Sequence, residues 1–190
     1  MNAATLGRRI IVSGPSGSGK STMGRNLGEL LDLPVVELDS IFHRDNWEPT
    51  PLDEFREAVT ARLDGHGDGW ICDGNYGTVR DIVLPRADTV VWLRLPFRVV
   101  YTRLVKRTLR RMCTRELLWG RNRESFRLSF LSRDSILLWG ITHWRPHHRN
   151  FEDALANIPH KADVHILRSP REVTEFVDSL ASDVARAPAR

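Results

Sequence analysis

The sequence predicts an α/β protein in which helices cover both faces of a parallel sheet, and three observations support this fold class. Short apolar runs alternate with helical patterns along the chain, as strands joined by crossover helices require. The run at residues 89–95 is apolar almost throughout, which is typical of a strand buried on both faces of a sheet. A glycine-rich segment directly follows the first apolar run and precedes a helical pattern, so a strand, a turn and a helix are expected in immediate succession.

Each expected element follows from its local pattern. We expect strands where short β-rich runs occur, at residues 9–12, 34–38, 70–72, 89–95 and 164–167. We expect helices where apolar residues recur at helical spacing, at residues 20–31, 51–64, 97–118, 125–143 and from 169 onward. The two helices between the fourth and fifth strands, with a hinge turn at 119–123, predict a lid-like helical region over about 98–150.

Length and composition suit one globular domain. Of the 190 residues, 41% are hydrophobic and 27% are charged, which is ordinary for a folded domain. We assign residues 1–183 to this domain and expect 184–190 to form a flexible tail. No signal-peptide pattern and no apolar run of roughly 18 residues is present, so we expect a cytoplasmic protein without membrane contact. Cys72 and Cys113 are too few for a disulfide framework.

The segment after the first strand is a phosphate-binding loop. It satisfies the pattern G-x-x-x-x-G-K-[ST] at every required position. Its glycines let the backbone approach a polyphosphate, so that consecutive N–H groups point at the phosphate oxygens. We expect Lys20 to reach the β and γ oxygens and the Ser21 hydroxyl to ligate Mg²⁺. The expected nucleotide-binding residues are Gly14, Pro15, Ser16, Gly17, Ser18, Gly19, Lys20, Ser21 and Thr22.

Positive charge is concentrated in one region of the chain. Residues 94–149 contain 14 Lys or Arg residues and three acidic ones, while the whole chain has a formal charge of +4. Such a region either clamps nucleotide phosphates or follows a nucleic-acid backbone. We recognise no helix-turn-helix, zinc-finger or RNA-binding signature, so a nucleic-acid partner is not favoured.

Seven segments together resemble one group of proteins. They are residues 14–22, Glu37-Leu38-Asp39, Asn46-Trp47, WICDGNY at 70–76, Arg80-Asp81, ADTVVWLRL at 87–95 and HILRSP at 165–170. With these residues the chain resembles the P-loop kinases of the adenylate-kinase-like group, and more closely the bacterial proteins labelled DNA topology modulation or FlaR-like proteins. The resemblance covers most of the chain, and WICDGNY followed by ADTVVWLRL is its specific part. It implies a P-loop NTPase fold with a five-stranded parallel sheet in the order 2-3-1-4-5 and a mobile lid after the fourth strand.

The resemblance also implies roles for two carboxylates. Asp39 is expected to end the second strand at the sheet edge where α/β proteins bind ligands. Related kinases use a carboxylate there to contact the acceptor hydroxyl, and Asp39 would position that oxygen or take its proton. The alternative is that Asp39 caps a turn at residues 40–43. Asp73 resembles the aspartate of the Asp-Gly segment of adenylate kinases, which implies that it holds Mg²⁺ or its waters; the alternative is a plain Asp-Gly turn.

Other residues are candidates for the phosphoryl-transfer step or for acceptor binding. Phosphoryl transfer develops charge that cations stabilise, so we expect an arginine-rich lid to supply catalytic groups. The candidates are Arg107 and Arg111 on one helical arm, faced by Arg145 and Arg149 on the other. On the acceptor side the candidates are Trp47, Asn75 and Arg80, of which Trp47 either stacks on a ring or serves as a hydrophobic anchor. Arg94 departs from related sequences, which often carry an acid at its position.

The sequence therefore favours an ATP- and Mg²⁺-dependent kinase that transfers the γ-phosphoryl group to a small acceptor. A nucleoside monophosphate, a nucleoside and another hydroxyl compound all remain open as acceptors. The alternatives are an ATP-binding regulator that contacts DNA through its basic helices, and a simple NTPase. His143, His147 and His148 lack an accompanying Cys or carboxylate at metal-ligand spacing, so a metal site there is not favoured. The sequence does not specify an oligomeric state.

Overall fold

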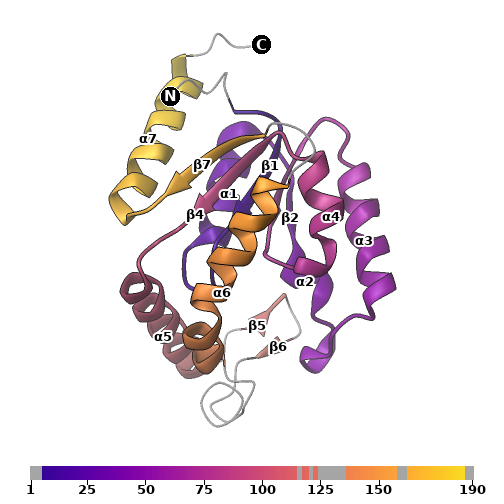
Figure 1. Ribbon diagram of the computed structural model, residues 1–190, viewed down its shortest axis with the longest axis vertical. Coiled ribbons are helices and arrows are strands. Elements are labelled where there is room, and N and C mark those ends of the chain that lie inside the picture. Colours follow the sequence, from indigo (N-terminus) through magenta and orange to yellow (C-terminus); the bar gives the residue numbers. More distant parts are fainter. Residues whose placement is uncertain (1–5, 115–116, 120–121, 124–135, 158–161, 187–190) are drawn as a thin grey trace.

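The computed structural model describes residues 6–114, 117–119, 122–123, 136–157 and 162–186. Five parallel strands form its main sheet, namely β1 (Arg9–Ser13), β2 (Val35–Glu37), β3 (Trp70–Asp73), β4 (Thr89–Leu93) and β7 (Asp163–Leu167). Their order is β2-β3-β1-β4-β7 (Figure 1). The predicted α/β class is confirmed. The numbering departs from the expected 2-3-1-4-5 because two short strands that were not predicted, β5 (Leu117–Leu118) and β6 (Asn122–Arg123), form a separate hairpin before β7.

Helices cover both faces of the sheet (Figure 1). Helices α1 (Lys20–Leu31) and α7 (Pro170–Arg186) pack on one face, whereas α3 (Leu52–Asp64), α4 (Arg80–Val83) and α6 (Ile136–Ala156) contribute to the core on the other. Side chains alternate along each strand between these two cores, because successive residues of a pleated strand point to opposite faces. Ile10 and Val12 thus pack with α1 and α7, whereas Ile11 belongs to the core of α3, α4 and α6. Trp70 and Trp92 are buried core residues.

The second strand ends earlier than the sequence suggested. It stops at Glu37, and a short helix, α2 (Leu38–Phe42), follows without a gap. Asp39 therefore lies in the first turn of α2 and does not end the strand. A 3₁₀ turn at Asp45–Trp47 then leads to α3, and similar turns flank α4, at Gly77–Val79 and Leu84–Arg86.

The predicted lid differs from the structure in its boundaries. Helix α5 (Phe97–Thr114) ends before residue 118, and β5 (Leu117–Leu118) pairs antiparallel with β6 (Asn122–Arg123) where a hinge turn was expected. Residues 120–121 of that turn and residues 125–135 of the predicted second lid helix lie outside the described part of the chain. Helix α6 continues past residue 143 and through Pro146. Its last turns pack on the sheet through Phe151, which is buried with its ring centroid 5.3 Å from that of Trp92.

The last helix starts with a capping box. The Glu172 N–H donates to Ser169 Oγ at 3.2 Å, and the Glu172 carboxylate accepts from the Arg168 N–H at 2.9 Å. The helix continues to Arg186, so residues 184–186, at the start of the expected flexible tail, are helical. Residues 187–190 lie outside the described part.

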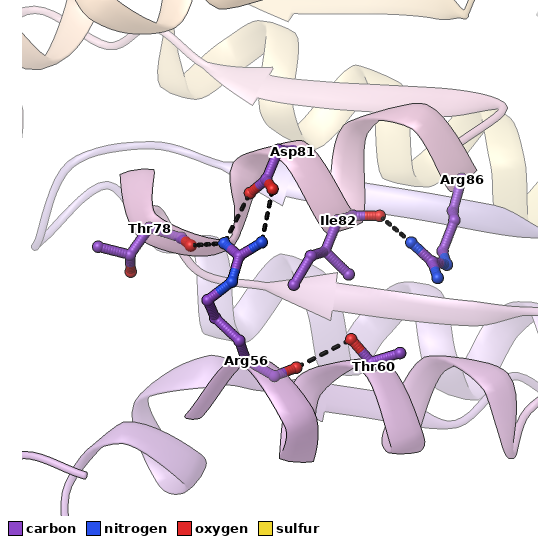
Figure 2. A network of polar contacts seen from close by, with 6 residues as sticks. All are labelled: Arg56, Thr60, Thr78, Asp81, Ile82 and Arg86. Atoms are coloured by element: carbon purple, nitrogen blue, oxygen red, sulfur yellow. Dashed lines mark hydrogen bonds and ion pairs between the residues drawn. The ribbon is translucent and has the colours of Figure 1, made fainter. Parts of the chain in front are cut away.

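A polar network joins α3 to the segment around α4 (Figure 2). The Arg56 guanidinium makes two hydrogen bonds to the Asp81 carboxylate, at 2.9 and 2.6 Å, and also donates to the Thr78 carbonyl. Because this pair is largely exposed, its contribution to stability is small.

Within the described ranges, no helix is both long enough and apolar enough to cross a membrane.

Gly74, directly after β3, allows a close approach that another residue would prevent. Its φ is +152°, and a Cβ there would lie 2.7 Å from the Cβ of Leu38, the neighbour of Asp39. We expect Gly74→Ala to lower the free energy of unfolding by about 1–3 kcal/mol, measured by chemical denaturation. Gly77→Ala in the same loop meets nothing within 4 Å and should stay within about 0.5 kcal/mol of the parent. Equal effects of the two substitutions would contradict this explanation.

Candidate functional site

The phosphate loop connects β1 directly to α1. Gly17 and Gly19 have φ values of +89° and +96°, which glycine adopts without strain. Helix α1 begins at Lys20, so its positive end and unpaired N–H groups face the loop. Lys20 is only 8% exposed. A cavity of about 550 Å³ lies over the loop, and its lining includes Ser16, Gly17, Gly19, Lys20, Ser21 and Thr22.

Asn75 holds the start of this loop. Its Oδ1 accepts hydrogen bonds from Ser13 Oγ at 2.8 Å and from the Gly14 N–H at 3.1 Å, and its Nδ2 donates to the Gly14 carbonyl. The sequence predicted an acceptor contact for Asn75, whereas the structure places it against the loop backbone. It therefore positions the phosphate loop, and its contact with an acceptor stays a prediction.

Asp73 lies at the end of β3, next to the first turn of α1. It is 4% exposed, and burial raises the pKa of its carboxyl, while Lys20 and a hydrogen bond with Ser21 oppose that rise. Asp73 Oδ1 has no hydrogen-bond partner among the described residues. A buried carboxylate oxygen without a partner, beside a hydroxyl and the phosphate loop, suits a hard cation that prefers oxygen ligands. The donor set of Ser21 and Asp73 therefore fits Mg²⁺.

Asp39 lines the same cavity and is held by Tyr76. The Tyr76 hydroxyl donates to Asp39 Oδ1 at 2.7 Å. Burial, followed by the nearby Asp39 charge, raises the pKa of Tyr76, so its hydroxyl remains a donor at neutral pH. Asp39 is thus fixed at the cavity through its side chain. Sequence reasoning assigned no role to Tyr76, although it belongs to the WICDGNY segment.

Helix α5 brings a row of arginines to the phosphate loop. Arg107 and Arg111, both predicted, line the cavity together with Arg103 and Arg110, which were not singled out. Arg103 Nη1 donates to the Ser18 carbonyl at 3.3 Å. The sequence could have indicated Arg103 as well, because residues 103, 107 and 111 are four apart and therefore lie on one face of a helix. The helix packs directly on the loop. A Cβ added at Gly17 would lie only 2.5 Å from the Val100 carbonyl oxygen of α5, so no larger residue fits there.

Arg145 and Arg149 are not brought to these arginines. They line a second hollow of about 520 Å³ beside Arg94, Trp144 and Arg168. Arg145 and Arg149 thus line a different hollow from Arg107 and Arg111, and their part in catalysis stays a prediction.

The structure gives Arg94 a local role. Its guanidinium lies 3.3 Å from the Glu152 carboxylate and 5.1 Å from the centroid of the Trp92 ring. A basic residue at this position thus joins β4 to α6.

Arg80 also contacts α6. Its guanidinium donates to the Asn150 carbonyl at 3.0 Å and lies 5.8 Å from the Phe151 ring centroid, and burial lowers its pKa. Arg80 is not part of the cavity lining that includes Asp39. In this structure Arg80 thus makes a contact between α4 and α6, and its grip on an acceptor anion stays a prediction.

Aromatic residues complete the cavity near Asp39. Trp47, which was predicted, lines it with His43 and Trp119, which were not. Trp119 Nε1 donates to the Glu37 carboxylate at 3.1 Å. Glu37 also lines the cavity, so two carboxylates at the end of β2 and the start of α2 face it.

The histidines of α6 give no metal site in the described part of the chain. His148 is buried and lies against Trp92 and Trp144, and burial lowers its pKa. The side chains of His143 and His147 lie outside what the structure describes. Among the described residues, no group of three or more His, Cys, Asp or Glu side chains is placed to hold a metal ion.

Solved kinase structures share this fold. A gluconokinase from Sinorhizobium meliloti 1021 is 18% identical, with a TM-score of 0.51 over 94% of this chain and 91% of its own. A sugar kinase from Janibacter sp. HTCC2649 is 17% identical, with a TM-score of 0.52 over 96% and 99%. A shikimate kinase from Acinetobacter baumannii in complex with shikimate is 19% identical, with a TM-score of 0.51 over 95% and 94%. No family model and no curated protein matches the sequence. The chain thus has the fold of P-loop kinases, and the finer likeness to FlaR-like proteins has no support from these matches.

The raised pKa of Asp73 predicts that its charge weakens the ligand-free fold. Folding becomes less favourable as pH rises from the ordinary aspartate range, near 3.8, through the raised folded-state pKa, because the buried carboxyl then ionises. Asp73→Asn should therefore increase the free energy of unfolding at pH 7 by roughly 0.5–2 kcal/mol, with the gain shrinking at low pH. Chemical denaturation over a pH series, without nucleotide or Mg²⁺, measures this difference.

Asp68→Asn is the matched control, since Asp68 is exposed. It should show no such pH-dependent gain. A loss of stability in Asp73→Asn at every pH would mean that pairing with Lys20 outweighs the cost of burial.

Proposed function

We propose that this protein is a kinase that transfers the γ-phosphoryl group of ATP to a hydroxyl group of a small acceptor, with Mg²⁺ as the metal. One observation carries the proposal: a single cavity joins the phosphate loop, the arginines of α5 and the carboxylate of Asp39. Donor, charge-stabilising and acceptor groups thus face the same space, as phosphoryl transfer requires. The gluconokinase, sugar kinase and shikimate kinase of the same fold support a small-molecule acceptor.

The donor would be held by the loop and the start of α1. Backbone N–H groups of the loop and the Lys20 ammonium would bind the β- and γ-phosphate oxygens. Ser21 and Asp73 would hold Mg²⁺, which when bound neutralises phosphate charge. Asn75 maintains the loop in this shape through its bonds to Ser13 and Gly14.

The acceptor hydroxyl would lie next to Asp39. Its oxygen would form a bond to the γ-phosphorus while the bond from that phosphorus to the bridging oxygen breaks, and ADP leaves with the electron pair. The hydroxyl proton would pass to Asp39, as it does to the catalytic carboxylate of other kinases. Tyr76 keeps the Asp39 carboxylate oriented through its hydrogen bond to Oδ1.

The arginines of α5 would stabilise the charge on the transferred group. They line the cavity at the phosphate loop, where preorganised cations act without reorganising during the reaction. The β5–β6 hairpin closes another side of the same cavity through Leu117, Leu118 and Trp119. This cover would reduce the access of water, which competes with the acceptor hydroxyl for the phosphoryl group.

Substitution of Asp39 tests the acceptor step. We expect Asp39→Asn to lower kcat for acceptor phosphorylation by about 10²- to 10⁴-fold, because the proton acceptor is lost while the phosphate loop is unchanged. Acceptor-stimulated ADP formation over a panel of nucleoside monophosphates, nucleosides, sugars and sugar acids is the measurement. Asp53→Asn, at an exposed carboxylate of α3, is the control. No stimulation by any acceptor would count heavily against the kinase.

A DNA-contacting regulator is less well supported, because four arginines of α5 line the phosphate-loop cavity. We expect duplex DNA to bind weakly and to leave the rate of ATP turnover unchanged. Titration with DNA at about 50 and 200 mM salt is the measurement, since a surface that follows phosphates loses affinity steeply over this range. Tight binding with a steep salt slope would favour the regulator instead.

A further inference from the structure

The cavity is lined by chemically different groups from different elements. The loop, α1 and α5 supply its cations, which are Lys20, Arg25, Arg103, Arg107, Arg110 and Arg111. The segment from β2 to the turn before α3, together with the hairpin, supplies two carboxylates, Glu37 and Asp39, and three aromatic side chains. Arg25 lies 3.6 Å from Glu37, so each of these two groups partly offsets the charge of the other, and Asp39 is left as the main negative charge near the acceptor. The side on which Asp39 would receive an acceptor is therefore acidic and aromatic.

His43, Trp47 and Trp119 form what we call the aromatic wall. The centroid of the His43 ring lies 5.2 Å from that of Trp47 and 5.8 Å from that of Trp119, and the two tryptophan rings are 5.9 Å apart. Both tryptophans are only partly buried, although they line a cavity. Burial lowers the pKa of His43, which keeps its ring uncharged at neutral pH. The wall thus presents flat, neutral surfaces next to two carboxylates.

The wall is held in place by contacts between distant parts of the chain. Trp47 and Trp119 have φ values of +65° and +49°, in a region that bulky residues rarely adopt. Such strain persists where surrounding contacts enforce it, and it is concentrated at ligand sites. Asn122 is 1% exposed; its Oδ1 accepts from the Trp47 N–H at 3.0 Å and its Nδ2 donates to the Arg44 carbonyl at 2.9 Å. The Trp119 indole is fixed by its bond to Glu37.

We propose that the aromatic wall binds the phosphate acceptor and selects an alcohol that has a flat ring face and carries no negative charge, as a nucleoside or a sugar does. This inference rests on the proposed kinase function. Aromatic side chains stack on bases and on other ring faces, and that contact does not need a charge on the ligand. An acceptor with a phosphate or carboxylate would bring a negative charge toward Glu37 and Asp39, which repel it.

Acceptors in matched pairs test the charge preference. Each nucleoside is compared with its 5′-monophosphate and each sugar with the corresponding sugar acid, by kcat/KM for ADP formation at saturating ATP. We expect the uncharged member to be preferred at least tenfold. Preference for the charged member would overturn this inference and leave the kinase standing, whereas no stimulation by any member would count against the kinase itself.

Substitutions in the wall test the binding role. We expect Trp47→Ala and Trp119→Ala to raise the acceptor KM about 10- to 100-fold, and Trp47→Phe and Trp119→Phe to raise it less, because a ring is retained. Glu37→Gln should improve the charged acceptors relative to their uncharged partners, because one repelling charge is removed. Trp144→Phe, in the second hollow, is the control and should leave the acceptor KM within about twofold.

Binding of a non-hydrolysable ATP analogue shows which variants fold. If the alanine variants fail to bind it, the phenylalanine variants and Glu37→Gln decide the question. An acceptor KM that stays within twofold in all folded wall variants, or an unchanged charge preference in Glu37→Gln, would overturn the proposal.

Discussion

The site depends on the alignment of the carboxyl ends of three parallel strands. In the sheet, Val12 of β1 and Glu37 of β2 are both paired with Asp73 of β3. The phosphate loop, the carboxylate of Asp73 that we propose as a Mg²⁺ ligand and the chain leading to Asp39 therefore leave the sheet at the same level, where open α/β sheets bind ligands. A slip of one residue between β1 and β3 would turn Asp73 to the other face, so the hydrogen-bond ladder fixes the chemistry as well as the fold.

This alignment places charged groups inside the protein, at a cost in stability. Lys20 and Asp73 are buried next to a core in which every β4 residue is buried. Buried charges are costly unless they are paired or ligated, and the opposite effects of burial and of Lys20 on the pKa of Asp73 reflect that balance. Binding of the proposed triphosphate and divalent cation is thus expected to raise the free energy of unfolding.

Features with a local cause could be predicted from the sequence, and features held by distant contacts could not. The phosphate loop, the main strands and the burial of Trp70 and Trp92 follow from patterns within a few residues. The roles of Asn75 and Arg80 depend on Gly14 and Asn150, which are 61 and 70 positions away. The wall depends on Asn122, which is 75 positions from Trp47. A sequence pattern shows what type of residue is present, but such pairings are decided only by the assembled fold.

The two sides of the cavity are consequently held by different means. The donor side is fixed mainly by backbone, through positive φ angles at two glycines and a helix packed so closely on Gly17 that no side chain fits there, with the Asn75 side chain bonded to Gly14 at the start of the loop. The acceptor side is fixed by side chains, because Asn122 and Glu37 hold the two tryptophans. Backbone constraints of this kind suit any triphosphate, whereas side-chain contacts can change without altering the sheet. Kinases that share this fold at under 20% identity therefore have the freedom to differ most in the part of the site that receives the acceptor.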